Sequence, residues 1–228
     1  MLKVGTLTVV CATVLVAAKS CTVQFGSGDP SSPGGSTVLL GVPYFQQETE
    51  MYCVPAAIQM WAAYNGNYVS QTDIANYIGC TPNGGTLLEN VAKGVMRYTN
   101  AKDAYPDYDG GIGDPSVVQA NFTSRQVTSL LARTPVLSVV NNGLHAGILD
   151  GGVWHTDDST GLYVWDLVYF SDPQVGPDTR VDPGTWMEEI QSQIISRSAT
   201  VSAPSELATY GPNIVARGTA FRFKPQQN

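Results

Sequence analysis

Cys53 is the residue of this sequence whose surroundings best suit a nucleophile. It precedes an apolar pattern with helical spacing, and Pro55 suits the first turn of a helix because its missing N–H costs nothing there. A helix N-terminus offers unpaired N–H groups and the positive end of the helix dipole, which favour a thiolate. Gln47, six residues earlier, could donate its side-chain amide to a developing oxyanion together with the Cys53 N–H. Cys53 and Gln47 together predict covalent catalysis by a thiol. The alternative is that Cys53 is a structural thiol or half of a disulfide, and the presence of Gln47 disfavours it.

Three stretches around this cysteine resemble a known peptidase family: residues 42–47 (VPYFQQ), 52–57 (YCVPAA) and 64–66 (YNG). They are similar to the opening of the papain-like cysteine peptidases of the bacteriocin-leader-processing, or double-glycine peptidase-like, family. The resemblance implies a helix that bears the nucleophilic cysteine, an oxyanion glutamine six residues before it, and a later strand that presents a histidine. It covers most of residues 41–190 and assigns the first two roles to Cys53 and Gln47.

The same resemblance assigns the general base to His145 and leaves two residues for the third member of a triad. His145 opens the stretch HAGILDG, which has the form expected of the strand that presents the base. In the family, the aspartate of an Asp-Pro pair after the next strand orients the imidazole, and Asp172 followed by Pro173 fits that description. Asp166 is closer to His145 in the sequence but lies inside an apolar stretch. The resemblance therefore favours Asp172 over Asp166.

A second group of polar residues could ligate a metal ion. His155 is followed by Asp157 and Asp158, yet no further His or Cys stands at the spacing of a metal ligand. A polar hairpin tip is the preferred interpretation. The mechanism implied by a Cys–His pair needs neither a metal nor an organic cofactor.

The elements that must position these residues fall into two groups. From Cys53 to Val95, apolar residues recur with a 3.6-residue period and predict three short helices, with capping boxes at Ser70 and Thr86. Residues 103–115 are interpreted as a surface loop or connection. After a helix at about residues 124–133, shorter apolar runs separated by turn residues predict strands at 136–140, 145–149, 162–170 and 214–223. The predicted fold is α+β and papain-like, with a helical lobe that bears Cys53 packed against a C-terminal antiparallel β-sheet lobe.

The N-terminal residues are typical of an export signal. Lys3 is followed by an apolar run from Val4 to Ala18, and small residues occupy both specificity positions of a signal-peptidase site, Ala18 and Ser20. The run of about 15 residues is shorter than the roughly 20 that a membrane span needs. We expect residues 1–20 to be a signal peptide, residues 21–37 a flexible tether rich in Gly, Ser and Pro, and residues 38–228 the catalytic domain. The protein would then be exported, either secreted or anchored at the cell surface.

Cys21 directly follows the predicted cleavage site, where a bacterial lipoprotein carries its lipid. Lipidation and plain secretion are both open. Cleavage would leave three cysteines, Cys21, Cys53 and Cys80, and Cys53 must be reduced to act as a nucleophile. Cys21 and Cys80 therefore either pair with each other or stay apart. Nothing in the sequence places the tether near Cys80, which favours a lipidated or unpaired Cys21.

The composition narrows the class of partner. The chain has 12 Lys and Arg against 19 Asp and Glu, a formal net charge of −7, and no basic cluster that could follow a phosphate backbone. No nucleic acid is expected as a partner. We expect a monomeric thiol-dependent peptidase that acts on a peptide or protein substrate. The alternatives are a papain-type amidase or acyltransferase acting on cell-wall peptides, and an inactive surface-binding relative that has lost one of the catalytic groups.

Overall fold

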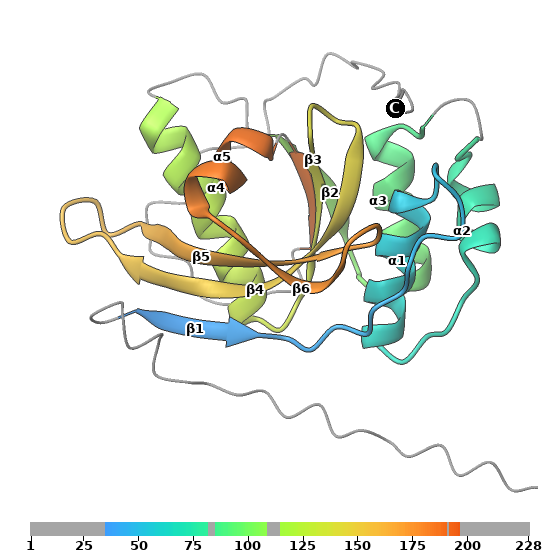
Figure 1. Ribbon diagram of the computed structural model, residues 1–228, viewed down its shortest axis with the longest axis horizontal. Coiled ribbons are helices and arrows are strands. Elements are labelled where there is room, and N and C mark those ends of the chain that lie inside the picture. Colours follow the sequence, from blue (N-terminus) through green and yellow to red (C-terminus); the bar gives the residue numbers. More distant parts are fainter. Residues whose placement is uncertain (1–34, 82–84, 109–114, 191, 197–228) are drawn as a thin grey trace, which may run out of the picture.

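The computed structural model describes residues 35–81, 85–108, 115–190 and 192–196, and within these ranges it contains a mixture of helices and antiparallel strands. In chain order the elements are β1 (Ser36–Leu39), α1 (Cys53–Tyr64), α2 (Gln71–Ile78), α3 (Leu88–Tyr98), β2 (Ala104–Tyr108), α4 (Pro115–Leu131), β3 (Val136–Val140), β4 (His145–Thr156), β5 (Tyr163–Asp172), β6 (Gly176–Val181), α5 (Pro183–Glu189) and β7 (Ser192–Ser196). Figure 1 shows α1, α2 and α3 gathered on one side of the molecule and α4 and α5 on the other, with strands running between the two groups. The predicted α+β fold, a helical lobe packed against an antiparallel sheet, is confirmed.

Helix α1 lies at the centre of the helical lobe. Of its 12 residues, ten are buried, and the helix contacts α2 and α3 on one side and β4 on another. Four alanines among the buried residues let these neighbours approach closely. The helix begins at Cys53 and ends before Asn65 and Gly66, where Gly66 adopts a φ of 81° that glycine tolerates without strain. Burial on all sides therefore fixes the N-terminal end of α1, and with it Cys53, against the sheet.

The two shorter helices differ in how they begin. Ser70 caps α2 as predicted, because its Oγ accepts a hydrogen bond from the Asp73 N–H at 3.1 Å. The capping box predicted at Thr86 is wrong. Leu87 is the N-cap of α3, and the Thr86 hydroxyl donates instead to the Ile78 carbonyl at 2.6 Å. Thr86 thus connects the end of α2 to the start of α3.

The sheet has the strand order β2-β7-β3-β4-β5-β6, with every pairing antiparallel. β3 pairs with the first half of β4, and β1 pairs with the second half along the same edge. In the β4–β5 hairpin, Ile148 stands opposite Ser171. The beginning of β4 and the end of β5 are therefore neighbours, which places His145 and Asp172 at the same end of the sheet.

Several boundaries differ from the sequence-based expectations. Residues 103–115 were expected to form a loop, but residues 104–108 form β2, which pairs with β7. β2 is an edge strand, where Pro106 removes no bond that the sheet needs. The helix expected at 124–133 extends over 115–131, and β1 begins at Ser36, two residues inside the expected tether. β3 matches its predicted range, whereas the strand expected at 214–223 lies outside the described residues.

The tryptophans belong to the core. All four are buried, and Trp186 of α5 is fully buried, with its ring centroid 5.3 Å from that of Phe170. The indole N–H groups of Trp165 and Trp186 both donate to the buried Gln126 side chain of α4, at 2.8 and 3.4 Å.

Within the described ranges, no helix combines the length and the apolar character that crossing a membrane requires.

Candidate active site

The side chains of Cys53 and His145 meet where α1 faces the sheet. Cys53 is the first residue of α1, so its backbone N–H has no acceptor within the helix and points out of the helix N-terminus. His145 is the first residue of β4, and the Cys53 side chain lies close enough to its ring to raise its pKa. The Cys53 thiol is free and buried, with 6% of its surface exposed. A thiol held this way beside an imidazole has the geometry of an activated nucleophile.

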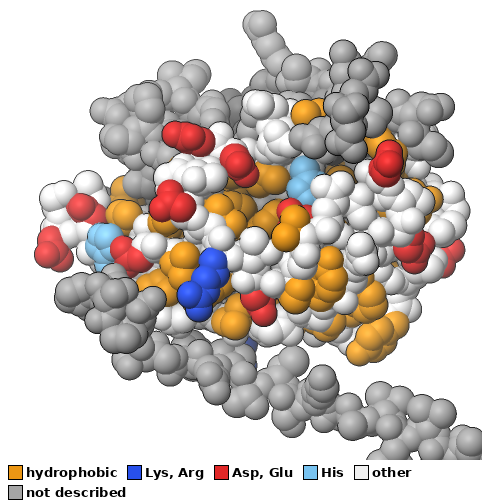
Figure 2. Space-filling view, in the orientation of Figure 1, with side chains coloured by type: hydrophobic (Ala, Val, Ile, Leu, Met, Phe, Trp, Pro, Cys, Tyr) orange, Lys and Arg blue, Asp and Glu red, His pale blue; other side chains and the backbone are white. Residues whose placement is uncertain are grey.

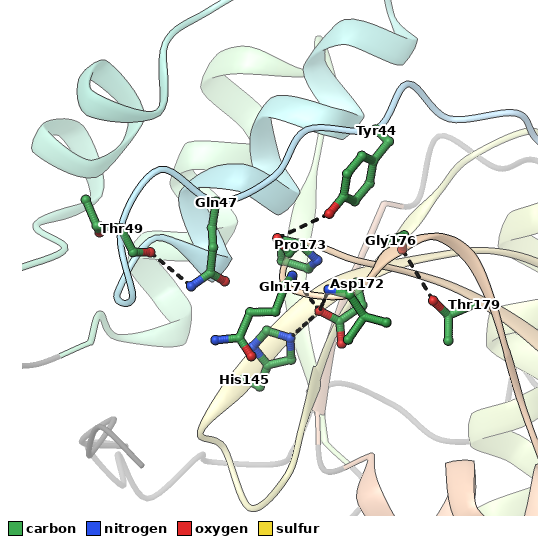
Figure 3. A network of polar contacts seen from close by, with 10 residues as sticks. Tyr44, Gln47, Thr49, His145, Asp172, Pro173, Gln174, Gly176 and Thr179 are labelled. Carbon is green, nitrogen blue, oxygen red and sulfur yellow. Dashed lines mark hydrogen bonds and ion pairs between the residues drawn. The ribbon is translucent and has the colours of Figure 1, made fainter. Parts of the chain in front are cut away.

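Asp172 lies on the other side of the same imidazole. Its Oδ1 is 2.9 Å from His145 Nε2, which leaves Nδ1 as the ring nitrogen available to Cys53 (Figure 3). The two side chains are only 13% and 16% exposed. Asp172 Oδ1 also accepts the N–H groups of Gln174 at 2.7 Å and Val175 at 3.3 Å, in the turn between β5 and β6. This turn therefore fixes the carboxylate that orients the histidine.

The charges of this group stabilise one another. Burial alone lowers the pKa of His145, but hydrogen bonds and charge interactions with Asp172 and Cys53 outweigh it and raise that pKa to about 9. Burial raises the pKa of Asp172, yet the bond and the charge of His145, with two backbone N–H groups, lower it overall. The pKa of His145 rises and that of Asp172 falls for the same reason: each residue stabilises the charged form of the other. At neutral pH the site holds an imidazolium beside a carboxylate.

Asp166, the second residue considered for this position, lies elsewhere. Its Oδ1 is 2.9 Å from Nδ1 of His155, near the far end of the β4–β5 hairpin, where the side chains are 22% and 44% exposed. The nearby turn is held by Asp157, whose Oδ1 accepts N–H groups of Ser159 and Thr160. The polar hairpin tip is thus as predicted. Across the described ranges, no three His, Cys, Asp or Glu residues are grouped so that they could hold a metal ion.

Gln47 lies in the segment that leads to α1. Its backbone N–H donates to the Pro173 carbonyl at 3.0 Å, so this segment is joined to the turn that follows Asp172. Its side-chain Nε2 donates to the Thr49 carbonyl at 2.9 Å, and its buried Oε1 has no partner (Figure 3). A carboxamide nitrogen carries two N–H groups, so one remains for an oxyanion.

Tyr44 adds a second contact at the same carbonyl. Its hydroxyl donates to the Pro173 oxygen at 3.4 Å, and both burial and the charge of Asp172 raise the pKa of this phenol. No sequence pattern indicates this contact, because the acceptor is a main-chain carbonyl 129 residues away. The Pro173 carbonyl thereby receives two donors from the segment before α1.

Cys80, whose role the sequence left open, is a free thiol near the site. Its Sγ contacts the Met51 carbonyl at 3.4 Å. Burial, with a smaller contribution from the charge of Cys53, raises the pKa of Cys80 to about 11. This thiol is therefore protonated at neutral pH, which makes it a poor nucleophile beside Cys53.

The face of the molecule seen in Figure 2 carries few basic side chains. Figure 2 shows scattered acidic side chains over one face of the molecule, with basic side chains confined to a small area.

A hollow lies at the C-terminal end of α1 and is lined by Trp61, Asn65, Thr99 and Arg133, among others. It is about 12 to 18 Å along the helix from Cys53, so it is no part of the active site.

The arrangement is suited to acyl transfer through a thiol. None of the curated proteins compared with the chain matches it. It is similar to the solved structure of a double glycine motif protease from an AMS/PCAT transporter in complex with the leader peptide, with 17% identity, a TM-score of 0.45, and 69% of this chain and 91% of that chain covered. It is also similar to a C39-like peptidase from Bacillus anthracis, with 16% identity, a TM-score of 0.45, and coverage of 71% and 98%. The Peptidase_C39 like family matches residues 39–182, more than half of the chain, so the chain belongs to that family and is a cysteine peptidase.

Proposed function

We propose that this protein is an exported thiol peptidase that hydrolyses peptide bonds through Cys53, His145 and Asp172, with Gln47 in the oxyanion hole. The observation that carries the proposal is a single imidazole that bonds the Asp172 carboxylate through Nε2 and lies beside the Cys53 side chain at the N-terminus of α1. A nucleophile, a base and a residue that orients the base are the three parts such catalysis requires.

In the first half of the reaction, the Cys53 thiolate attacks the carbonyl carbon of the scissile amide, and a C–S bond forms. The carbonyl oxygen gains negative charge, which the Cys53 N–H and the Gln47 side-chain N–H stabilise. His145, protonated in the resting site, donates its proton to the amine nitrogen as the C–N bond breaks. The amine product leaves and a thioester remains on Cys53.

In the second half, His145 is neutral and takes a proton from a water molecule. The hydroxide attacks the thioester carbonyl, and the same two N–H donors stabilise the oxyanion. The C–S bond then breaks, the carboxylic acid leaves, and the thiolate is again beside a protonated His145. Asp172 keeps its charge throughout and holds the ring in the orientation that both proton transfers need.

The location of the substrate follows from the N-terminal residues. We propose a peptide or protein outside the cytoplasm as the substrate, because the apolar run from Val4 to Ala18 and the small residues Ala18 and Ser20 favour export. We propose a lipidated or unpaired Cys21, because nothing in the sequence places the tether near Cys80. We further propose that the enzyme acts as a monomer, since every group of the proposed mechanism comes from one chain.

An epoxide inhibitor of cysteine peptidases tests the nucleophile directly. We expect the inhibitor to modify Cys53 alone, as mapped by mass spectrometry, and hydrolysis of fluorescein-labelled casein to fall in parallel with the modification. The variant Cys80→Ser should be labelled and inhibited like the natural chain. Labelling of Cys80, or casein hydrolysis that persists when Cys53 is fully modified, would contradict the proposal. Products of acyl transfer in place of casein fragments would instead point to an acyltransferase.

The pH dependence of hydrolysis reports on His145. Its pKa in the folded protein, about 9, lies above the ordinary value of 6.5, so the protonated ring is retained up to about pH 9. We expect kcat/KM to fall on the alkaline side with an apparent pKa near 9, a value that belongs to the coupled pair. The same shift stabilises the fold fully below pH 6.5, and this contribution is lost as the pH rises through 9. An alkaline limb near 6.5 would show that the imidazolium is not stabilised as described.

A further inference from the structure

Leu40 and Val42 anchor the start of the segment before α1 in the core, but the residues next to Gln47 have few buried side chains to hold them. From Gln46 to Glu50, only Gln47 is even partly buried, and the chain from Leu40 to Gln47 forms no helix or strand. Fixing each backbone residue costs roughly 1–2 kcal/mol of conformational entropy. A catalytic donor on such a segment therefore needs specific bonds to the main chain on either side of it.

Gln71 provides two of these bonds. It is the first residue of α2 and only 1% exposed. Its side-chain Nε2 donates to the Gln46 carbonyl at 2.8 Å, and its Oε1 accepts the Glu48 N–H at 2.9 Å. These are the main-chain groups immediately before and after Gln47. The orientation of the Gln71 amide is determined by its partners, because a carbonyl can only accept and an N–H can only donate.

The remaining N–H of Gln71 connects this contact to the helix that bears Cys53. Nε2 also donates to Oε1 of Gln59 in α1 at 3.0 Å, and the Gln59 amide in turn donates to the Val69 carbonyl at 2.8 Å. Two other fully buried glutamines, Gln126 and Gln193, each leave one polar atom unpaired. The side chain of Gln71 has no unpaired polar atom, and two of its three bonds go to the segment of Gln47.

The opposite side of the segment is fixed by the sheet lobe, through the bond from the Gln47 N–H to the Pro173 carbonyl. We propose that Gln71 is a positioning residue, which clamps the main chain on both sides of Gln47 and so sets the position of the oxyanion donor relative to Cys53. This inference rests on the proposed function, in which Gln47 donates to the oxyanion. Gln71 itself touches no reacting atom.

Two substitutions remove the clamp in different ways. Gln71→Met keeps the length of the side chain without its polar atoms, and Gln71→Glu keeps the shape and the acceptor for the Glu48 N–H but cannot donate to Gln46. Displacement of a catalytic group by about 1 Å can cost about 100-fold in rate. We expect kcat for fluorescein-labelled casein to fall about 10- to 100-fold in both variants, with KM changed less than about threefold.

A second measurement separates positioning from a general loss of structure. Alkylation of Cys53 by iodoacetamide needs the thiolate but forms no oxyanion, so its rate should stay within about twofold of the natural chain in both Gln71 variants. The control Gln193→Met removes a buried amide that bonds Asp107, remote from Gln47 along the sheet, and should leave both rates unchanged. Parallel loss of hydrolysis and alkylation in the Gln71 variants would overturn the inference.

The strictest test combines Gln71→Met with Gln47→Ala. If Gln71 acts through Gln47, adding Gln71→Met to the Gln47→Ala variant should lower kcat less than about twofold further. Residues that act as a unit have effects that are not additive. Effects that multiply would overturn the role of Gln71. If the natural chain hydrolyses casein and the Gln71→Met variant does so equally fast, this inference alone would be overturned. Absence of hydrolysis by the natural chain would overturn the proposed function, and the role of Gln71 with it.

Discussion

Cys53→Ala should lower peptide hydrolysis by up to about six orders of magnitude, to the level of the uncatalysed reaction plus what binding alone provides. The Cys53 side chain supplies the only proposed covalent bond to the substrate, and nothing else near His145 can replace it. His145→Ala should be about as severe, since the thiolate then loses its charge partner and the leaving amine its proton donor. The double variant should be no worse than either single one, because the two residues act as one unit. The measurement is casein hydrolysis at enzyme concentrations high enough to detect traces of activity.

Matched controls exist in the same chain for both substitutions. Cys80→Ala removes the other free thiol of the described residues, and His155→Ala removes the other histidine, which lies at the exposed hairpin tip. Both variants should keep hydrolysis within about threefold. Circular dichroism and the thermal midpoint should show that every variant is folded. Turnover by Cys53→Ala that an epoxide inhibitor cannot block would exclude Cys53 as the nucleophile.

The helical lobe could be predicted from the sequence because its signals are local. Helix α1 begins at Cys53 and ends before Asn65, as the apolar periodicity and the turn residues indicate. The Ser70 cap was also a local signal, and it is present. The box at Thr86 failed because α3 begins one residue later than the motif indicated, with Leu87 as its N-cap, and the Thr86 hydroxyl donates to the Ile78 carbonyl of the preceding helix. A capping motif predicts a bond only where the helix begins at the residue that follows it.

The sheet lobe was predicted less completely, because strand pairing depends on residues far apart in the sequence. β3 is buried along its whole length and was found as an apolar run. β6 is short, largely exposed and rich in polar residues, so nothing in its pattern separates it from a turn. β7 joins β2 to β3 and was missed, although all five of its residues are buried, because three of them are polar. Only the pairing itself identifies these strands.

The active site shows the same division. Cys53, Gln47 and His145 were named from motifs, and the structure brings the Cys53 and His145 side chains together. Gln71 was not named, although a local signal existed: it lies on the same face of α2 as Ile74 and Ile78, and that face is buried. A polar residue on the apolar face of a short helix must find partners, since a buried amide without hydrogen bonds costs about 1–3 kcal/mol. Which partners it finds cannot be inferred from spacing.

The choice between Asp172 and Asp166 gives the second large prediction. Asp172→Ala removes the acceptor of His145 Nε2, and we expect kcat to fall by about 10²- to 10⁴-fold, because the ring then loses both its orientation and the charge that favours its protonated form. The alkaline limb of the pH profile should move from about 9 toward 6.5, the value of a free imidazole. Asp166→Ala should change kcat less than about twofold, since its partner His155 is exposed and such surface pairs contribute about 0–1 kcal/mol.

Asp172→Asn separates the charge of Asp172 from its structural role. An asparagine oxygen can still accept from His145 and from the N–H groups of Gln174 and Val175, so the turn after β5 keeps its bonds. Only the negative charge is lost. We therefore expect a smaller loss of kcat than in Asp172→Ala but the same direction of shift in the alkaline limb, with the thermal midpoint closer to that of the natural chain. A loss of activity in Asp166→Ala as large as that in Asp172→Ala would show that the wrong carboxylate has been placed in the triad. An alkaline limb that stays near 9 in Asp172→Asn would show that the carboxylate orients His145 without stabilising its charge.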